Sequence, residues 1–188
     1  MRRYRIPMVI TSHTAENNAV LAAANAVCAA ARTAPKACGF DFIGSAIITG
    51  DEMLGIAQEM RKVGESLGER GLFFIRDAKN VEESQALVLI GASYDVRNLG
   101  AICSLCGFEN CQKCIDAGAA CVYAGIDLGI ALGSACAMLA DLRIDNRMMF
   151  TAGKAAAQLG YLGKYKMIIG VPLSVSCKSP FFDRDRPQ

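Results

Sequence analysis

Charge of either sign is scarce in this sequence, and the little that is present nearly cancels. Charged residues make up 20% of the 188 positions, and the formal net charge is only +2. A protein that binds DNA or RNA needs a clustered basic face to neutralise phosphates, whereas the basic residues here are scattered. We therefore expect no nucleic-acid partner. A disordered chain is also excluded, because 53% hydrophobic residues can bury enough surface to fold as one domain.

Other signatures are missing as well. No Gly-x-Gly-x-x-Gly fingerprint occurs, so the sequence predicts no Rossmann-type nicotinamide site. The single histidine, His13, stands among polar residues, and we assign it no catalytic role. The apolar run at positions 6–10 is too short for the hydrophobic region of a secretory signal. We therefore expect a cytoplasmic protein, whose nine cysteines are metal ligands, redox groups or core residues rather than disulfides.

A long stretch at 117–140 carries Asp127 as its only charge. It is long enough to span a bilayer, but it consists mainly of Ala and Gly, and an Asp near its centre costs about 2.5–3.5 kcal/mol on insertion. We expect no membrane span, and instead a central helix buried on every side, with small residues where other helices come close. Because a buried acid must be satisfied, Asp127 is expected to cap the helix start or to pair with a nearby Arg.

Periodicity and turn residues divide the rest of the chain into helices and strands. The expected helices cover residues 16–34, 51–68, 122–142 and 151–159, and the expected strands cover 43–49, 72–75, 86–92 and 167–171. The strand at 86–92 is apolar throughout, which is typical of a strand covered on both faces. Residues 93–118 are irregular. The pattern predicts one layered domain of the α+β or α/β class.

Four cysteines fall within twelve residues of the irregular segment, and a fifth follows: Cys103, Cys106, Cys111, Cys114 and then Cys121. A short Cys-x2-Cys-x4-Cys loop can wrap around a compact object, and an iron–sulfur cubane held by four thiolates suits that wrap. Structural zinc is the alternative, although zinc sites usually have two Cys-x2-Cys knuckles further apart. We predict a [4Fe–4S] site on Cys103, Cys106 and Cys111, with either Cys114 or Cys121 as the fourth ligand.

Gly107 directly follows the second cysteine and lets the backbone turn close to the cluster. The other cysteines, Cys28, Cys38, Cys136 and Cys177, have no partners at ligand spacing. Those inside the Ala-rich helices are expected in the core.

Two parts of the chain resemble the nitroreductase-type FMN enzymes. The matching stretches are Ala-Arg-Thr-Ala-Pro-Lys at 31–36, Gly-Phe-Asp-Phe-Ile at 39–43, Gly-Asp-Glu at 50–52, and later 127–131, 144–146 and 169–172. Lys36 stands where that family usually has Ser, and Asp41 is the polar residue nearest to the place of its Asn. The resemblance implies a layered α/β/α sandwich, a homodimer with the long helix at its core, and FMN at the subunit interface.

Nearly the whole chain also resembles a prokaryotic family of ferredoxin-domain-containing proteins. The stretches that carry this resemblance are 31–36, Phe-Ile-Arg-Asp-Ala at 74–78, the cysteine loop, 127–134, Asp-Asn-Arg at 145–147, and 170–184. The similarity to modules with Cys-x2-Cys-Gly-x3-Cys and a later fourth Cys implies Cys121 rather than Cys114. Together, the resemblances predict the fold class: α+β, a nitroreductase-like α/β/α sandwich. They predict a single domain over 1–188 with an iron–sulfur insertion at 98–121.

A flavin site follows from the same resemblance. FMN needs basic side chains or backbone amides for its phosphate and polar groups beside its ring. The candidate ligands are basic or polar side chains near the first loop, after the long helix and in the tail: Arg32, Lys36, Asp41, Asn146, Lys178 and Arg184.

We therefore expect a redox protein that carries a [4Fe–4S] cluster on a nitroreductase-like, FMN-binding scaffold and transfers electrons between cluster and flavin. In that case it is a flavin-dependent oxidoreductase whose redox partner the sequence does not specify. Two alternatives stay open: a non-enzymatic iron–sulfur carrier or sensor without flavin, and a structural zinc protein.

Overall fold

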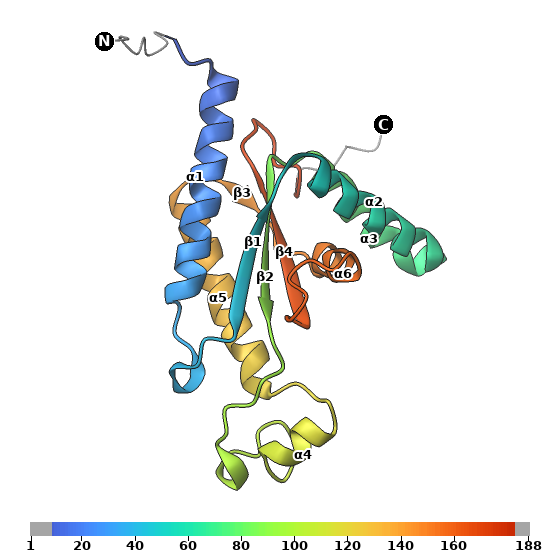
Figure 1. Ribbon diagram of the computed structural model, residues 1–188. Helices are drawn as coiled ribbons and strands as arrows, with labels where there is room; N and C mark the ends of the chain where they lie inside the picture. Colours follow the sequence, from blue (N-terminus) through green and yellow to red (C-terminus); the bar gives the residue numbers. More distant parts are fainter. Residues whose placement is uncertain (1–8, 183–188) are drawn as a thin grey trace, which may run out of the picture.

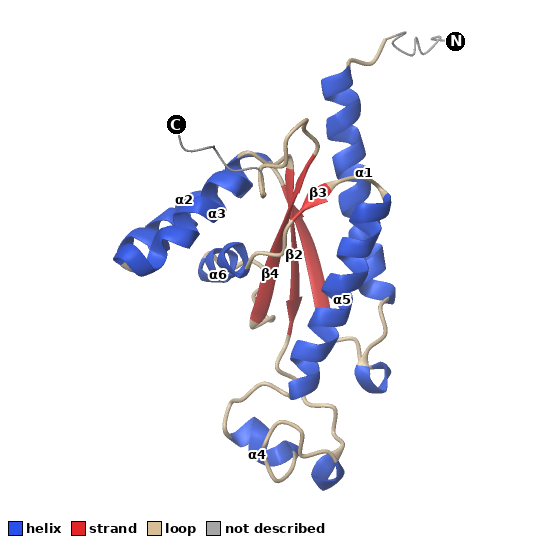
Figure 2. Cartoon of the chain, turned by 180° about the vertical axis from the view of Figure 1, so that it is seen from behind, coloured by secondary structure: helices blue, strands red, loops and turns tan. Residues whose placement is uncertain are grey.

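The computed structural model describes residues 9–182, and it arranges them in three layers around a sheet (Figure 1). Helices α1 (Ser12–Thr33) and α5 (Val122–Asp141) cover one face of the sheet, and α2 (Gly50–Ser66), α3 (Leu72–Glu82) and α6 (Phe150–Gln158) cover the other. The view from behind in Figure 2 shows the same division. The α+β class and the α/β/α layering predicted from the sequence are confirmed.

The sheet is antiparallel throughout and has the order β1-β2-β4-β3. Its strands are β1 (Ile43–Ile48), β2 (Ala86–Ala92), β3 (Asp145–Asn146) and β4 (Met167–Ser174). All seven residues of β2 are buried, as expected for an apolar strand between two helical layers. The register places Ile43 opposite Ala92 and Ala92 opposite Met167, so these three residues mark one end of the sheet.

Strand β4 runs three residues past its predicted end at Val171. Leu173 directs its carbonyl toward β2, where it accepts from the Gln85 N–H at 3.0 Å. Because neighbouring residues of a strand point their backbone groups to opposite sides, Pro172 turns its nitrogen toward the β3 side. The two-residue β3 pairs only with Leu173 and Ser174, so the missing N–H of Pro172 costs no ladder hydrogen bond.

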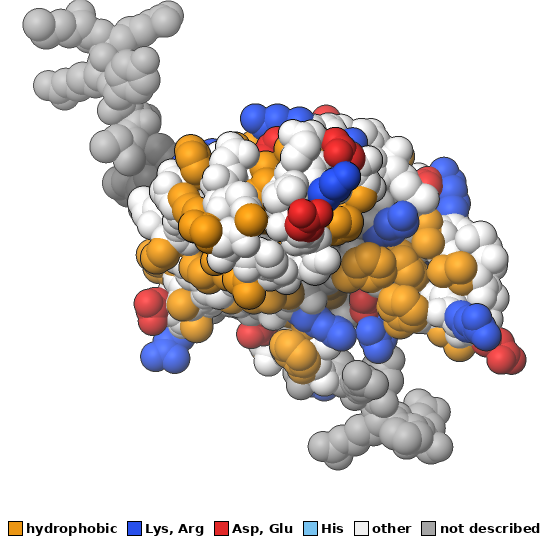
Figure 3. Space-filling model, turned by 90° about the horizontal axis from the view of Figure 1, so that it is seen from below, with side chains coloured by type: hydrophobic (Ala, Val, Ile, Leu, Met, Phe, Trp, Pro, Cys, Tyr) orange, Lys and Arg blue, Asp and Glu red, His pale blue; other side chains and the backbone are white. Residues whose placement is uncertain are grey.

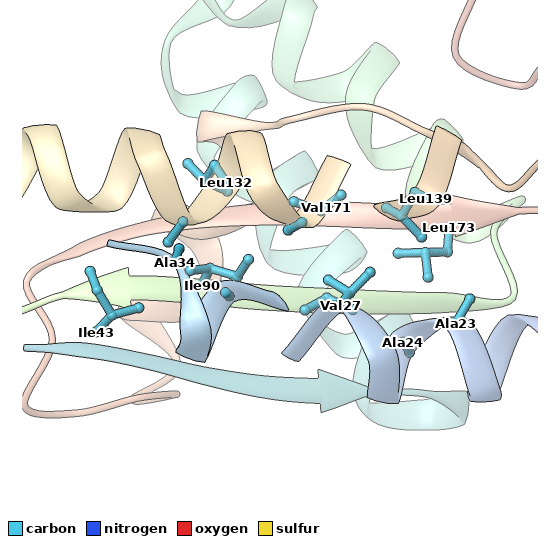
Figure 4. Close-up of a cluster of buried hydrophobic side chains, with 14 of the residues drawn as sticks. Ala23, Ala24, Val27, Ala34, Ile43, Ile90, Leu132, Leu139, Val171 and Leu173 are labelled. Atoms are coloured by element: carbon cyan, nitrogen blue, oxygen red, sulfur yellow. The ribbon is translucent and has the colours of Figure 1, made fainter. Parts of the chain in front are cut away.

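Two hydrophobic clusters lie on opposite faces of the sheet. The first fills the space between the sheet and helices α1 and α5, where Val27, Ile90 and Leu132 are buried (Figure 4). The second lies between the sheet and α2, α3 and α6. There α6 approaches β4 so closely that a Cβ at Gly153 would lie 1.8 Å from the Ile168 carbonyl oxygen. Only glycine fits at this contact.

The prediction of a strand at 72–75 is wrong, because these residues begin helix α3. Phe74, Ala78 and Val81 are buried and recur at helical spacing, which places them against the second core. Four apolar residues taken alone suggest a strand. The helical period becomes visible only over the full eleven residues.

Helix α5 is the one helix in residues 9–182 that is long and apolar enough to cross a membrane. Seven of its residues are buried, among them Leu128, Ala131 and Leu139, and it packs on α1 and β2. The long small-residue helix is where the sequence predicted it, but the prediction that it is buried on every side is wrong: only seven of its twenty residues are buried, and the face with Gly125, Gly129 and Gly133 is exposed.

Candidate functional site

The predicted cysteine loop connects β2 to α5 and projects from one end of the sheet (Figure 1). It contains two short helical turns, η3 (Gly100–Ile102) and α4 (Cys111–Asp116). The two ends of the loop are joined, because the Cys121 N–H donates to the Tyr94 carbonyl at 3.4 Å. The loop thus returns to its starting point before α5 begins.

All five cysteines of this segment line one small cavity: Cys103, Cys106, Cys111, Cys114 and Cys121. Cys114 and Cys121 are buried, whereas the other three are half-buried. In this structure no three Cys, His, Asp or Glu side chains of residues 9–182 converge on the position of a single metal ion. The spacing argument from the sequence therefore holds to the level of a shared cavity, and the ligand assignment stays a prediction.

The loop surface around this cavity is rich in apolar side chains. Ile102, Leu105 and Ile115 are 89%, 62% and 51% exposed. Figure 3 views the molecule from this end and shows hydrophobic side chains among scattered charged ones. A group held by half-buried thiols in such a loop lies near solvent.

The surroundings of Cys114 raise the pKa of its thiol. Burial, a hydrogen bond with Cys106 and the negative charge of nearby thiolates, including Cys121 and Cys111, raise the pKa of the Cys114 thiol. Its Sγ donates to the Ala119 carbonyl at 3.5 Å. Both effects favour the protonated thiol in the cofactor-free protein, and a metal would have to displace this proton.

The backbone of the loop turns tightly through left-handed residues. Gly107 has a φ of 81°, as its predicted turn requires, and Ser104 has a φ of 46°. Cys103, which precedes Ser104, is right-handed. Successive right- and left-handed residues direct neighbouring N–H groups toward one point, an arrangement that binds anions and occurs at iron–sulfur sites.

A buried ion pair closes the inner side of the site. The Arg97 Nη2 donates to Asp127 Oδ2 at 2.6 Å, and both side chains are 1% exposed. Asp127 Oδ1 also accepts from the Ala37 N–H at 3.0 Å. The expectation that an Arg pairs with this acid of the long helix is confirmed. The pair ties three segments together: the cysteine loop, α5 and the loop after α1.

Arg97 itself lines the cysteine cavity. Its Nη1 donates to the Asp95 carbonyl at 2.7 Å, and its guanidinium lies 4.6 Å from the centre of the Phe42 ring. Its Nε is buried and has no hydrogen-bond partner. An unsatisfied buried donor costs about 1–3 kcal/mol, and more when it is charged, so an acceptor at this position would stabilise the protein.

Helix α5 also begins at the cavity. Cys121 is its N-cap residue, no side chain caps its first turn, and Val122 and Tyr123 line the cavity. The N-terminus of a 20-residue helix carries a partial positive charge that favours thiolates and bound anions. Buried thiols, a buried guanidinium and a helix N-terminus together fit a metal–sulfur anion.

The basic side chains of the loop after α1 form hydrogen bonds within the protein. Lys36 Nζ donates to the carbonyls of Ala31, Arg32 and Ala34 at 3.1, 2.6 and 2.7 Å, and its side chain is only 6% exposed. It satisfies the C-terminal end of α1 rather than facing solvent. A phosphate at this loop would have to compete with three carbonyls for the Lys36 ammonium.

Arg32 is the more accessible cation of this loop, with a side chain 58% exposed. It pairs with Asp41 and also donates to the Ile43 carbonyl. Burial alone would raise the pKa of Asp41, but the hydrogen bonds from Arg32 and the Ile43 N–H, together with two nearby cations, outweigh it and lower that pKa. Asp41 is therefore ionised at neutral pH and holds Arg32 in place.

The remaining flavin candidates lie elsewhere. Asn146 pairs with Leu173 at the end of the sheet opposite Asp41, and its Nδ2 donates to the Ile144 carbonyl. Lys178 is exposed and follows β4 at that same end. Arg184 lies outside the described residues. Within one chain, the structure does not bring the two groups of candidates together.

Sequence reasoning did not name Arg97 as a site residue. Its position in an irregular segment gives no periodic signal. The signal that could have found it was Asp127, because a buried acid requires a cationic partner. Only the fold shows which of the available arginines supplies it.

Solved structures with a similar arrangement include flavoproteins. An FMN-bound nitroreductase from Bacteroides fragilis superposes with a TM-score of 0.58 at 13% identity, over 89% of this chain and 83% of that one. A BluB-like flavoprotein from Clostridium difficile gives 0.57 at 13% identity, over 97% and 87%. The likeness establishes a nitroreductase-like fold, the predicted fold class.

The particular family follows from sequence. An uncharacterised protein of Archaeoglobus fulgidus is 43% identical over 185 residues, which cover 94% of this chain and 98% of the relative. A family profile described as uncharacterised protein containing a ferredoxin domain matches residues 117–184, a segment that includes Cys121 but not the first four loop cysteines. The chain belongs to this family of ferredoxin-domain-containing proteins, as its motifs predicted. A ferredoxin domain implies an iron–sulfur cluster, and family and fold together indicate a redox protein.

Proposed function

We propose that this protein is an electron-transfer protein that binds a [4Fe–4S] cluster in the cysteine cavity. The observation that carries the proposal is the lining of this cavity, where five thiols meet a buried arginine with an unused N–H donor. Cys103, Cys106, Cys111 and Cys121 are the proposed ligands. Cys114, whose thiol already donates to the Ala119 carbonyl, is the alternative fourth.

The chain supplies charge compensation for such a group. A cubane with four thiolate ligands is anionic, and both Arg97 and the start of α5 place positive charge at the cavity. Asp127 holds the guanidinium in position from behind. Bound there, the cluster would supply single-electron transfer, and an FMN on the same scaffold would accept one or two electrons.

A flavin site is the second part of the proposal. The solved relatives in fold include an FMN-bound nitroreductase. In this chain Arg32 is the exposed cation best placed to meet a phosphate, while Asn146 and Lys178 lie at the other end of the sheet. A partner protomer would have to combine the two groups. Flavin-dependent oxidoreductase activity depends on this site, whereas a carrier or sensor needs only the cluster.

We also propose that the protein is a cytoplasmic homodimer assembled through α5. Gly125, Gly129 and Gly133 form one exposed stripe at helical spacing, flanked by Ile126 and Ile130, which are 44% and 41% exposed. A Cβ at any of the three glycines would meet no atom within 4 Å. The chain's own packing therefore does not require these helix-weakening residues, whereas close approach of a second helix does.

The direct test is purification without oxygen, followed by measurement of the absorbance spectrum and of iron, sulfide, zinc and flavin content. We expect about four irons and four sulfides per chain with broad visible absorbance. Zinc without iron or sulfide, in protein from iron-rich medium, would instead establish the structural zinc alternative. Cluster without flavin would favour the carrier or sensor.

The flavin site has its own test. Titration of flavin-free protein with FMN, followed by flavin fluorescence, should show saturable binding that Arg32→Ala weakens at least tenfold, about 1.4 kcal/mol. A phosphate dianion makes strong charge-assisted hydrogen bonds with guanidinium, and Arg32 is the accessible donor. Lys62→Ala, which changes an exposed lysine on α2, is the control and should leave binding unchanged. Absence of binding at tens of micromolar FMN would remove the flavin from the proposal.

A further inference from the structure

We propose that Arg97 donates a hydrogen bond from Nε to the iron–sulfur cluster or to one of its thiolate ligands, and that this contact raises the reduction potential of the cluster. The inference rests on the proposed function, because it assigns the cluster as the partner of this arginine. It assigns Arg97 a role beside the proposed cysteine ligands, although Arg97 is not itself a ligand of the cluster.

One nitrogen of the Arg97 guanidinium group, Nε, has no hydrogen-bond partner. Nη2 is held by Asp127 at 2.6 Å, Nη1 by the Asp95 carbonyl at 2.7 Å, and the planar face by Phe42 at 4.6 Å. These three contacts fix the plane and direction of the group. Nε is buried without a partner in a side chain that lines the cavity.

The chemistry of the cavity supplies the kind of acceptor that is missing. Cluster sulfides and cysteine thiolates carry negative charge and accept hydrogen bonds. Arginine has no acceptor atom and does not lose its proton in proteins, so Arg97 can act only as a permanently charged donor. Five thiols line the cavity that Arg97 also lines, and we therefore assign sulfur as the acceptor for Nε.

Such a contact has a defined effect on the cluster. Reduction adds negative charge, and hydrogen bonds to the sulfurs and nearby positive charge stabilise the reduced state. Loss of the Nε–H should therefore lower the midpoint potential. The ion pair with Asp127 keeps the guanidinium aligned but does not itself contact the thiols.

The test uses the full chain, purified anaerobically with its cluster. Arg97→Lys keeps a cation that can pair with Asp127 but removes the Nε–H. We expect full iron and sulfide content and a reduction equilibrium constant about tenfold lower, which is 59 mV for a one-electron couple, in an EPR-monitored redox titration. Electron–nuclear double resonance after exchange into D2O should show one exchangeable-proton coupling in the wild type that the variant lacks, beside the couplings of loop backbone amides that both share.

Two further variants make the result decisive. Arg97→Gln combined with Asp127→Asn removes both charges without leaving a buried carboxylate unpaired, and it should lower the potential as well. Arg61→Lys changes an arginine of α2 that pairs with Glu82 of α3 through both Nε and Nη2, and it should leave the potential unchanged.

A wild-type potential and an intact exchangeable-proton signal in fully loaded Arg97→Lys would overturn the inference and reduce Arg97 to a partner of Asp127. If the wild-type chain contains no iron or sulfide, the proposed function fails first and the inference fails with it. Metal content separates that outcome from a failure that concerns Arg97 alone.

Discussion

Replacing Cys106 or Cys111 with serine is expected to remove nearly all iron and sulfide from the anaerobically purified protein. Each ligand holds one corner of a cubane, so loss of one thiolate opens the cluster to solvent and oxygen. Content should fall from about four irons per chain to less than about one, and the broad visible absorbance should disappear. Both cysteines are half-buried in the cavity wall, which allows serine to replace them without unfolding the protein.

The same series tests the fourth ligand. Cys121→Ser should lose the cluster, whereas Cys114→Ser should retain most of it, since the Cys114 thiol donates to the Ala119 carbonyl and its pKa is raised. Cys177→Ser is the matched control, because Cys177 is exposed beyond β4 and should not matter. The reverse result, with iron retained in Cys121→Ser and lost in Cys114→Ser, would show that the assignment is wrong.

The second large effect concerns assembly: Gly129→Leu should convert a dimer into a folded monomer. The new side chain meets no atom of its own chain, and replacing a helix-interior glycine improves helix propensity by up to about 1 kcal/mol. In the dimer it would force the paired helices apart. We expect the dissociation constant to rise at least a hundredfold, about 2.7 kcal/mol, in light scattering at micromolar concentrations.

A matched substitution separates assembly from folding. Gly55→Leu introduces the same side chain into α2, at a glycine that also faces open space. It should leave the dimer intact. A wild-type monomer at micromolar concentration, or an unchanged dimer in Gly129→Leu, would contradict assembly through α5.

Long periodic elements were predictable from the sequence, and short ones were not. The small-residue helix α5 and the apolar strand β2 have patterns that extend over many residues. Strand β3 has only two residues, and its pairing with Leu173 and Ser174 depends on where β4 happens to lie. Helix α3 was mistaken for a strand because its first four residues are all apolar and its helical period emerges later.

The site residues, too, were predictable only where no tertiary information was needed. Cysteine spacing along a short loop predicted a shared site, because nearby ligands need no tertiary information to meet. Lys36 was expected to bind phosphate from its place in a motif, yet its ammonium caps three carbonyls at the end of α1. Sequence specifies that a charge is present. The fold decides which oxygens it reaches.

Cys121 has two structural roles: it lines the cysteine cavity, and it is the N-cap residue of α5. Eight residues further along the same helix lies Gly129, at the centre of the proposed dimer face. A cofactor that holds Cys121 fixes the first turn of this helix, and a second protomer orders the same helix from its side. If both the proposed cluster and the proposed dimer order this helix, occupancy and self-association are thermodynamically linked, and each strengthens the other by an equal factor. In that case, oxidative loss of the cluster would weaken the dimer, and the assembly would be sensitive to oxygen.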